Sequence, residues 1–79
     1  MRIIEIQPTT KFGGGWIAFE APGVEPAFPG PSAKSDAISY ARGRFGGSSG
    51  EIHVLDDKGE TIVKVIKMDG GGQYGQART

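Results

Sequence analysis

The sequence predicts an α+β domain in which an antiparallel sheet of four to five short strands carries one helix on one face. Two strand-like segments come first, one segment with helical spacing lies in the middle, and a strand–turn–strand unit follows. A sheet and a helix each bury one apolar side, so laying the helix across the sheet is the simple way to form one core. The predicted order is strand, strand, a short third strand, helix, strand, strand.

The first half of the chain supplies the early strands. Residues 2–7, RIIEIQ, are rich in isoleucine and should stop at Pro8, which cannot continue a central ladder. Residues 16–21, WIAFEA, form the second strand, after a glycine-rich loop. Residues 24–28, VEPAF, suggest a short third strand, and Pro26 confines it to an edge of the sheet.

The helix is predicted over residues 32–45, SAKSDAISYARGRF. Its apolar side chains are spaced for one helical face: Ala37, Ile38, Ala41 and Phe45. Ser32 or Ser35 can cap the N-terminus, because a serine hydroxyl accepts a hydrogen bond from a free backbone N–H. The glycines at 46–47 stop the helix.

Residues 51–67, EIHVLDDKGETIVKVIK, read as a hairpin with Gly59 in the left-handed region of its turn. The register is open, since a shift of one residue exchanges the two faces. The preferred register places Val54 opposite Val63 and Ile52 opposite Val65, which makes one face uniformly apolar. The other face then has no intramolecular partner and carries His53, Leu55, Ile62, Lys64 and Ile66.

Length and composition limit how such a domain is stabilised. The chain has 79 residues, no cysteine and one histidine. Disulfides and the usual zinc sites are therefore excluded, and a second subunit is the remaining way to enlarge a small core. Residues 1–67 form one domain, and residues 68–79 are predicted to be a flexible glycine-rich tail. No apolar run is long enough to span a bilayer, and the start is too short and acidic for a signal peptide, which favours a cytoplasmic protein.

No motif for catalysis, for a cofactor or for a metal is present, and no small-molecule substrate is evident. Phosphate-binding glycine loops are missing. His53 is better interpreted as a solvent-facing strand residue than as a general base, and Asp56-Asp57 as turn residues. Trp16 is interpreted as a core residue, with base stacking as the alternative. Tyr40 and Phe12 are further candidates for outward contacts.

Three segments together resemble a family of short bacterial domains of unknown function. They are GGGWIAF, KSDAISYAR and IHVLDDKGETI, and the resemblance covers about residues 13–66. The family has a tryptophan-bearing strand, a K-x-E-A-I-x-x-A-R helix start and a V-H-x-x-D-G-x-I hairpin. The matching residues here are Trp16, Lys34, Asp36, Ala37, Ile38, Ala41, Arg42, His53, Gly59 and Ile62. The resemblance implies the strand–helix–hairpin order and brings no catalytic residue; the helix here is shorter than in the family.

The function predicted from these observations is a non-enzymatic binding module that forms a homodimer and acts as a small nucleic-acid-binding regulator of transcription. Lysine, arginine and histidine side chains on the helix and hairpin would contact DNA or RNA: Arg42, Arg44, His53, Lys64 and Lys67. The formal net charge of zero argues against this. The alternative is a protein–protein interaction module, without nucleic acid, that uses the open sheet face, with Leu55, Ile62 and Ile66 at the dimer interface.

Overall fold

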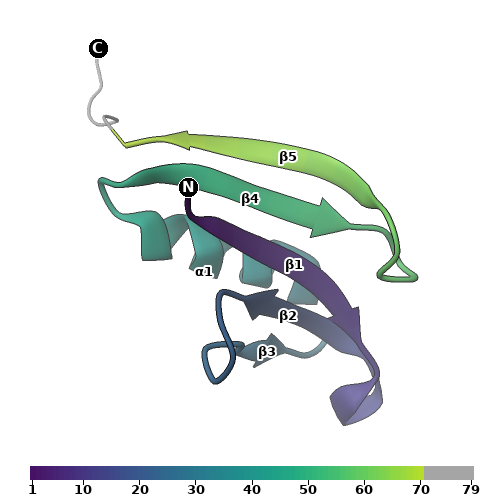
Figure 1. Ribbon diagram of the computed structural model, residues 1–79. Coiled ribbons are helices and arrows are strands. Elements are labelled where there is room, and N and C mark those ends of the chain that lie inside the picture. Colours follow the sequence, from purple (N-terminus) through teal and green to yellow (C-terminus); the bar gives the residue numbers. More distant parts are fainter. Residues whose placement is uncertain (71–79) are drawn as a thin grey trace.

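The computed structural model describes residues 1–70 and contains five strands, one α-helix and one short 3-10 helix (Figure 1). The sheet runs in the order β3-β2-β1-β4-β5, and α1 lies across one of its faces. The α+β class predicted from the sequence is confirmed. Residues 71–79, which include most of the predicted tail, lie outside the described residues. The elements are β1 (Ile3–Thr9), η1 (Lys11–Gly13), β2 (Gly15–Phe19), β3 (Ala27–Phe28), α1 (Ala33–Phe45), β4 (Ser49–Leu55) and β5 (Ile62–Asp69).

The sheet is mostly antiparallel, but its central pair, β1 and β4, is parallel. Ile4 lies beside Ile52, and Ile6 beside Val54. Parallel strands need a long crossover, and here it consists of β2, β3 and α1. The N-terminal strand is therefore central in the sheet, although it comes first in the chain.

Strand β1 continues through Pro8 to Thr9, so the prediction that it stops before the proline is wrong. Pro8 pairs with Trp16 of β2, while the last residue of β1 that pairs with β4 is Ile6. Proline is tolerated in a strand where its missing N–H faces no neighbouring strand. The β4 side of Pro8 meets this condition.

The core lies between α1 and the sheet, and its side chains are small or β-branched except for Phe45. Its buried members are Ile4, Ile6, Ala18, Ala37, Ala41, Phe45, Ile52 and Val54. The small buried side chains of Ala33, Ala37 and Ala41 allow the backbone of α1 to pack close to the sheet. Ile38 packs against this cluster while staying partly exposed, so the predicted helical face is confirmed. Trp16 of β2 also packs against it and is partly exposed. Ser32 precedes the helix without a side-chain capping bond, and Ser35 Oγ donates to its carbonyl at 3.1 Å.

The register of the β4–β5 hairpin differs by one residue from the preferred prediction. Val54 lies opposite Lys64 and Ile52 opposite Ile66, because a bulge at Val63 adds one residue to β5. Val65, opposite His53, therefore faces away from the helix, and Val63 is exposed in the bulge. The sequence cannot distinguish these registers by apolarity alone, because both parities of β5 are largely apolar and a bulge changes the parity.

The hairpin turn is organised by Asp56. Its Oδ1 accepts hydrogen bonds from the backbone N–H groups of Lys58 and Glu60 at 3.1 and 3.0 Å. These bonds, that from Glu60 above all, lower the pKa of the Asp56 carboxyl below its ordinary value. Gly59 has φ +72°, as the turn prediction requires. Strand β5 then runs to Asp69, so the predicted start of the tail at residue 68 is wrong.

Candidate functional site

Strand β5 forms a long edge of the sheet and extends beyond the cover of the helix. Helix α1 packs mainly on β2, with further contacts to β1, β3 and β4. The opposite edge strand, β3, has two residues and follows Pro26. Strand β5 has eight residues and pairs only with β4 within residues 1–70. Figure 1 shows it as the outermost strand, on the side away from β3.

The side chains of β5 are exposed although many are apolar. Ile62 is 46% exposed, Val63 58% and Val65 45%. Ile66 and Met68 turn toward the helix side and are partly buried against the core. A long, exposed and β-branched edge strand is a template for pairing with another chain. We define Ile62–Asp69, with this unpaired backbone, as the β5 edge.

The sheet face opposite α1 has a polar centre. Glu5 and His53 are neighbours across β1 and β4. His53 Nε2 lies 2.7 Å from Glu51 Oε1, and Gln7 Nε2 donates to Glu5 Oε1 at 2.6 Å. His53 and Glu51 are 16% and 21% exposed, so their neighbours on the sheet partly cover them. This open face therefore has two carboxylates near its centre, with apolar side chains of β2 and β5 on either side.

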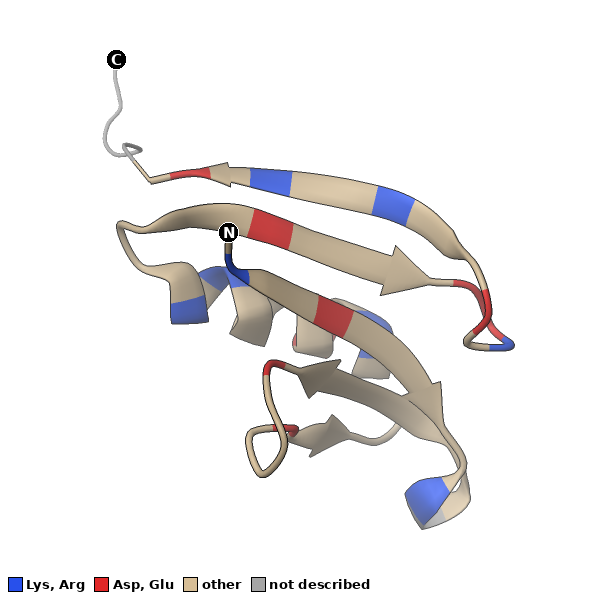
Figure 2. Cartoon of the chain, in the orientation of Figure 1, with Lys and Arg blue, Asp and Glu red and all other residues tan. Residues whose placement is uncertain are grey.

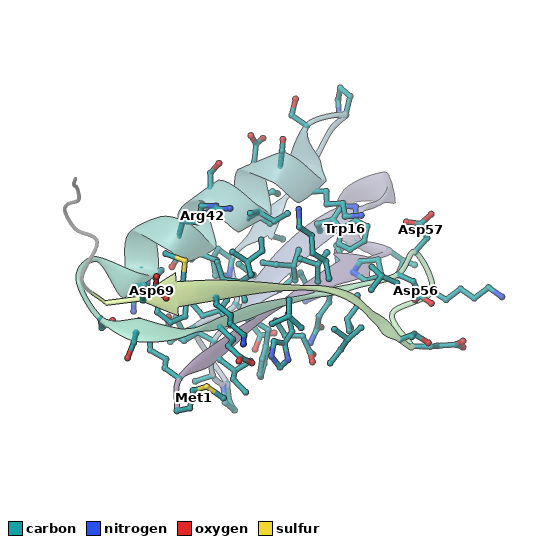
Figure 3. The ribbon with its side chains drawn as sticks, turned by 90° about the horizontal axis from the view of Figure 1, so that it is seen from above. Met1, Trp16, Arg42, Asp56, Asp57 and Asp69 are labelled. Carbon is teal, nitrogen blue, oxygen red and sulfur yellow. The ribbon has the colours of Figure 1, made fainter. Side chains whose placement is uncertain are left out.

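The residues predicted to bind nucleic acid lie on different sides of the sheet. Arg42 and Lys64 are on the helix side, as Figure 3 shows for Arg42. Lys67 and His53 are on the open face, where His53 contacts Glu51. Arg44 is in an ion pair with Glu20 at 2.9 Å. The fold does not bring these five side chains together into one cationic surface.

The three residues predicted for the dimer interface also separate. Ile62 is exposed, as expected. Leu55 is 8% exposed and so has little surface to offer, and Ile66 packs against the core on the helix side. The prediction that Leu55 and Ile66 form the exposed face is wrong: Leu55 is buried, and the bulge in β5 places Ile66 on the helix side. Val63 and Val65, which the sequence predicts to lie against the helix, are exposed as well.

Glu20, at the end of β2, holds two arginines from distant parts of the chain. Arg44 Nε lies 2.9 Å from its Oε1, and Arg2 Nη2 lies 3.0 Å from its Oε2. The hydrogen bond from Arg44, followed by that from Arg2, lowers the pKa of the Glu20 carboxyl. The same pairing raises the pKa of Arg44. This cluster connects the residue before β1 and the residue after β2 with the last turn of α1, so its role is structural.

Replacing Glu20 with glutamine is expected to make the free energy of unfolding depend less on pH below neutrality. The folded-state pKa of Glu20 is below its ordinary 4.5. Its contribution is therefore present above that value and is lost as pH falls through the folded-state pKa. Urea unfolding between neutral pH and about pH 3 should show the variant less stable at neutral pH and less sensitive to acid. Asp56, whose pKa is also lowered, contributes equally to the pH dependence of the variant and of the parent protein. The difference between their unfolding free energies therefore reports on Glu20.

The matched control is Glu25→Gln. Glu25 is exposed, and its carboxylate accepts one bond, from the N–H of Gly23 at 3.4 Å. Its profile should follow that of the parent protein. Parallel profiles for Glu20→Gln and the parent would contradict a pH-dependent role for the Glu20 cluster.

An open groove of about 480 Å³ lies between the end of β1 and the hairpin tip. Hydroxyl, amide, carboxylate and amine groups share its lining with two apolar residues. The lining residues are Gln7, Pro8, Thr9, Thr10, Ile17, Asp57 and Lys58. Within residues 1–70, no group of three histidine, cysteine or acidic side chains is placed to hold a metal ion. The same residues contain no helix long and apolar enough to cross a membrane.

The comparisons with known proteins add no relative to this geometry. No family model, curated protein or solved structure matches the chain. The resemblance to the bacterial family of unknown function therefore stays a sequence-based expectation. The β5 edge is the longest exposed edge of the sheet.

Proposed function

We propose that this protein is a non-enzymatic binding module that associates with another polypeptide through the β5 edge and the adjoining open face. One observation carries the proposal: β5 is an eight-residue edge strand with three apolar side chains about half exposed. Exposed apolar surface along an unpaired strand favours polypeptide partners, because a partner gains both backbone hydrogen bonds and apolar contact. A second copy of the chain and a different protein both belong to this class. A cytoplasmic location stays part of the same proposal.

The charge distribution favours a polypeptide over nucleic acid. A nucleic-acid interface needs several cations on one surface. Here Arg44 is paired with Glu20, and the open face places Glu5 and Glu51 beside His53. A regulator that binds DNA or RNA therefore becomes the competing hypothesis, and it depends on Arg42, Lys64 and Lys67.

The proposal is tested by placing a benzophenone photo-crosslinking side chain at Val63, with Ser39 as the control position. Ser39 is exposed on α1, remote from the edge. Irradiation in cell extract should give covalent adducts from position 63 and few from position 39. The adduct mass identifies the partner, since a second copy adds 8.3 kDa. Equal adducts at both positions, or none at 63, would count against the proposal.

A gel-shift experiment with nucleic acid tests the competing hypothesis. At about 50 mM salt, even non-specific phosphate binding is visible. The proposal expects no shift. A shift that disappears when Lys64 and Lys67 are both replaced with alanine would favour the nucleic-acid regulator instead.

A further inference from the structure

We propose that the β5 edge accepts a partner strand whose sequence reads acid–apolar–apolar–acid, and that Lys64 and Lys67 select it. The inference rests on the proposed polypeptide-binding function and names the chemistry of the partner. The added segment would become the sixth strand of the sheet, beside β5. Its backbone would supply hydrogen bonds, and its side chains would supply selectivity.

The pattern follows from four consecutive residues of β5: Lys64-Val65-Ile66-Lys67. Successive side chains of a strand point to opposite faces, so the two lysines, three positions apart, lie on different faces. Lys64 lies opposite Val54 on the helix side, and Lys67 lies opposite Glu51 on the open face. In paired strands, residues directly opposite each other share a face and make contact. A partner therefore needs an acid opposite each lysine and two apolar residues between them.

This pattern reads the same in both directions. A partner strand can therefore run parallel or antiparallel to β5 and still place its acids opposite the lysines. Val65, which is 45% exposed, gains an apolar neighbour on the open face. Ile66 gains one on the helix side, where α1 leaves it partly exposed.

The charges along the edge are not already neutralised within residues 1–70. Neither lysine is in an ion pair there, and both are exposed. Glu51 is the register partner of Lys67, but its Oε1 lies 2.7 Å from His53 Nε2. Figure 2 shows two blue bands on β5 and one red band at its end, which is Asp69. The edge is therefore cationic although the whole chain has a net charge of zero.

The same charges disfavour a second copy of the chain as the partner. Two β5 strands paired along their length would bring two copies of Lys64 and two of Lys67 onto one ribbon without opposing acids. In an antiparallel pair, a register that aligns Lys67 with Asp69 of the copy joins only the last residues of the strand. In a parallel pair, the same alignment leaves Lys64 opposite an isoleucine. In the whole sequence, the one pair of acids three apart is Asp57 and Glu60, and it encloses Lys58-Gly59 of the hairpin turn. The partner is therefore a segment of a different protein.

The test is a titration of the full-length, ¹⁵N-labelled protein with three short capped peptides. The first, Thr-Glu-Val-Val-Glu-Val-Thr, carries the pattern. The second has lysine at both glutamate positions. The third keeps both glutamates but has proline at the second central valine, which removes a backbone donor and disrupts strand pairing. Amide shift changes should be concentrated on β5, and hydrogen exchange of its amides should slow with the first peptide.

The first peptide is expected to bind more than tenfold more tightly than the other two. Replacing one glutamate by threonine should weaken binding about two- to fivefold, as expected for one cross-strand charge pair. The variant Lys64→Glu/Lys67→Glu should reverse the preference and select the lysine peptide. Both positions are exposed, so the fold should tolerate these changes, and the peptide comparison does not depend on them.

Two results would overturn the inference. Equal binding of the proline peptide would mean attraction of charges without strand pairing. No shift changes with the first peptide at millimolar concentration would mean that the edge does not accept this strand. If crosslinks from Val63 appear while the peptide fails to bind, the proposed function stands and the partner chemistry is wrong. If both experiments fail, the proposed function fails with the inference.

Discussion

Replacing Phe45 with alanine is expected to lower the free energy of unfolding by about 3–5 kcal/mol. The phenyl ring is 2% exposed at the end of α1, with the Arg2 guanidinium carbon 5.0 Å from its centroid. The other fully buried core residues are smaller than phenylalanine, and the structure around such a cavity relaxes only in part. At about 0.05–0.15 kcal/mol per residue, a domain of this size has little stability to lose. The variant should be substantially unfolded in mild urea.

Urea unfolding followed by the fluorescence of Trp16, the single tryptophan of the chain, measures this loss. Phe19→Ala is the matched control, because Phe19 lies partly exposed on the open face and undergoes the same chemical change. Its cost should be clearly smaller. Similar costs for the two variants would mean that Phe45 does not anchor the helix to the sheet.

Replacing Gly50 with alanine is expected to destabilise the protein by about 1–3 kcal/mol. Gly50 is buried in β4, and a Cβ there would overlap Phe45 Cε1 and the carbonyl oxygen of Arg2. The second obstacle is backbone, so it cannot move by rotating a side chain. Replacing glycine with alanine inside a helix or strand ordinarily stabilises a protein. A loss of stability at this position would therefore result from the steric conflict.

Gly43→Ala is the control for this substitution. A Cβ at Gly43 meets no atom within 4 Å, and the residue lies in α1. The change should raise the free energy of unfolding by about 0.5–1 kcal/mol, because alanine loses less backbone freedom in a helix. Urea midpoints that move in opposite directions confirm the prediction. Midpoints that both rise would show that β4 can move away from Phe45.

The sequence predicts the fold well because its periodicity changes clearly between elements. Ala37, Ala41 and Phe45 specify one helical face, and these residues are buried as expected. Pro26 correctly indicates that the third strand lies at an edge, although the strand itself is only Ala27–Phe28. The parallel pairing of β1 with β4 has no comparable local signal, because it depends on contacts between residues that are far apart in the chain.

The candidate site was harder to predict, because it depends on one bulge. Val63 and Val65 are exposed and Ile66 packs inward, which is the reverse of the predicted arrangement. Lys64 carries the signal that would have helped. Edge strands often carry an inward-pointing lysine, so its position on the helix side identifies β5 as the edge.

The parallel pairing of β1 also affects the order of events during synthesis. Ile4 and Ile6 leave the ribosome before their neighbours Ile52 and Val54, which follow more than forty residues later. Until β4 is made, β1 can pair only with β2. Closing so long a loop is entropically costly, which slows folding relative to proteins built from local contacts. Ile4 and Ile6 of the nascent chain therefore lack their β4 neighbours throughout this interval, which is when a chaperone would have most to bind.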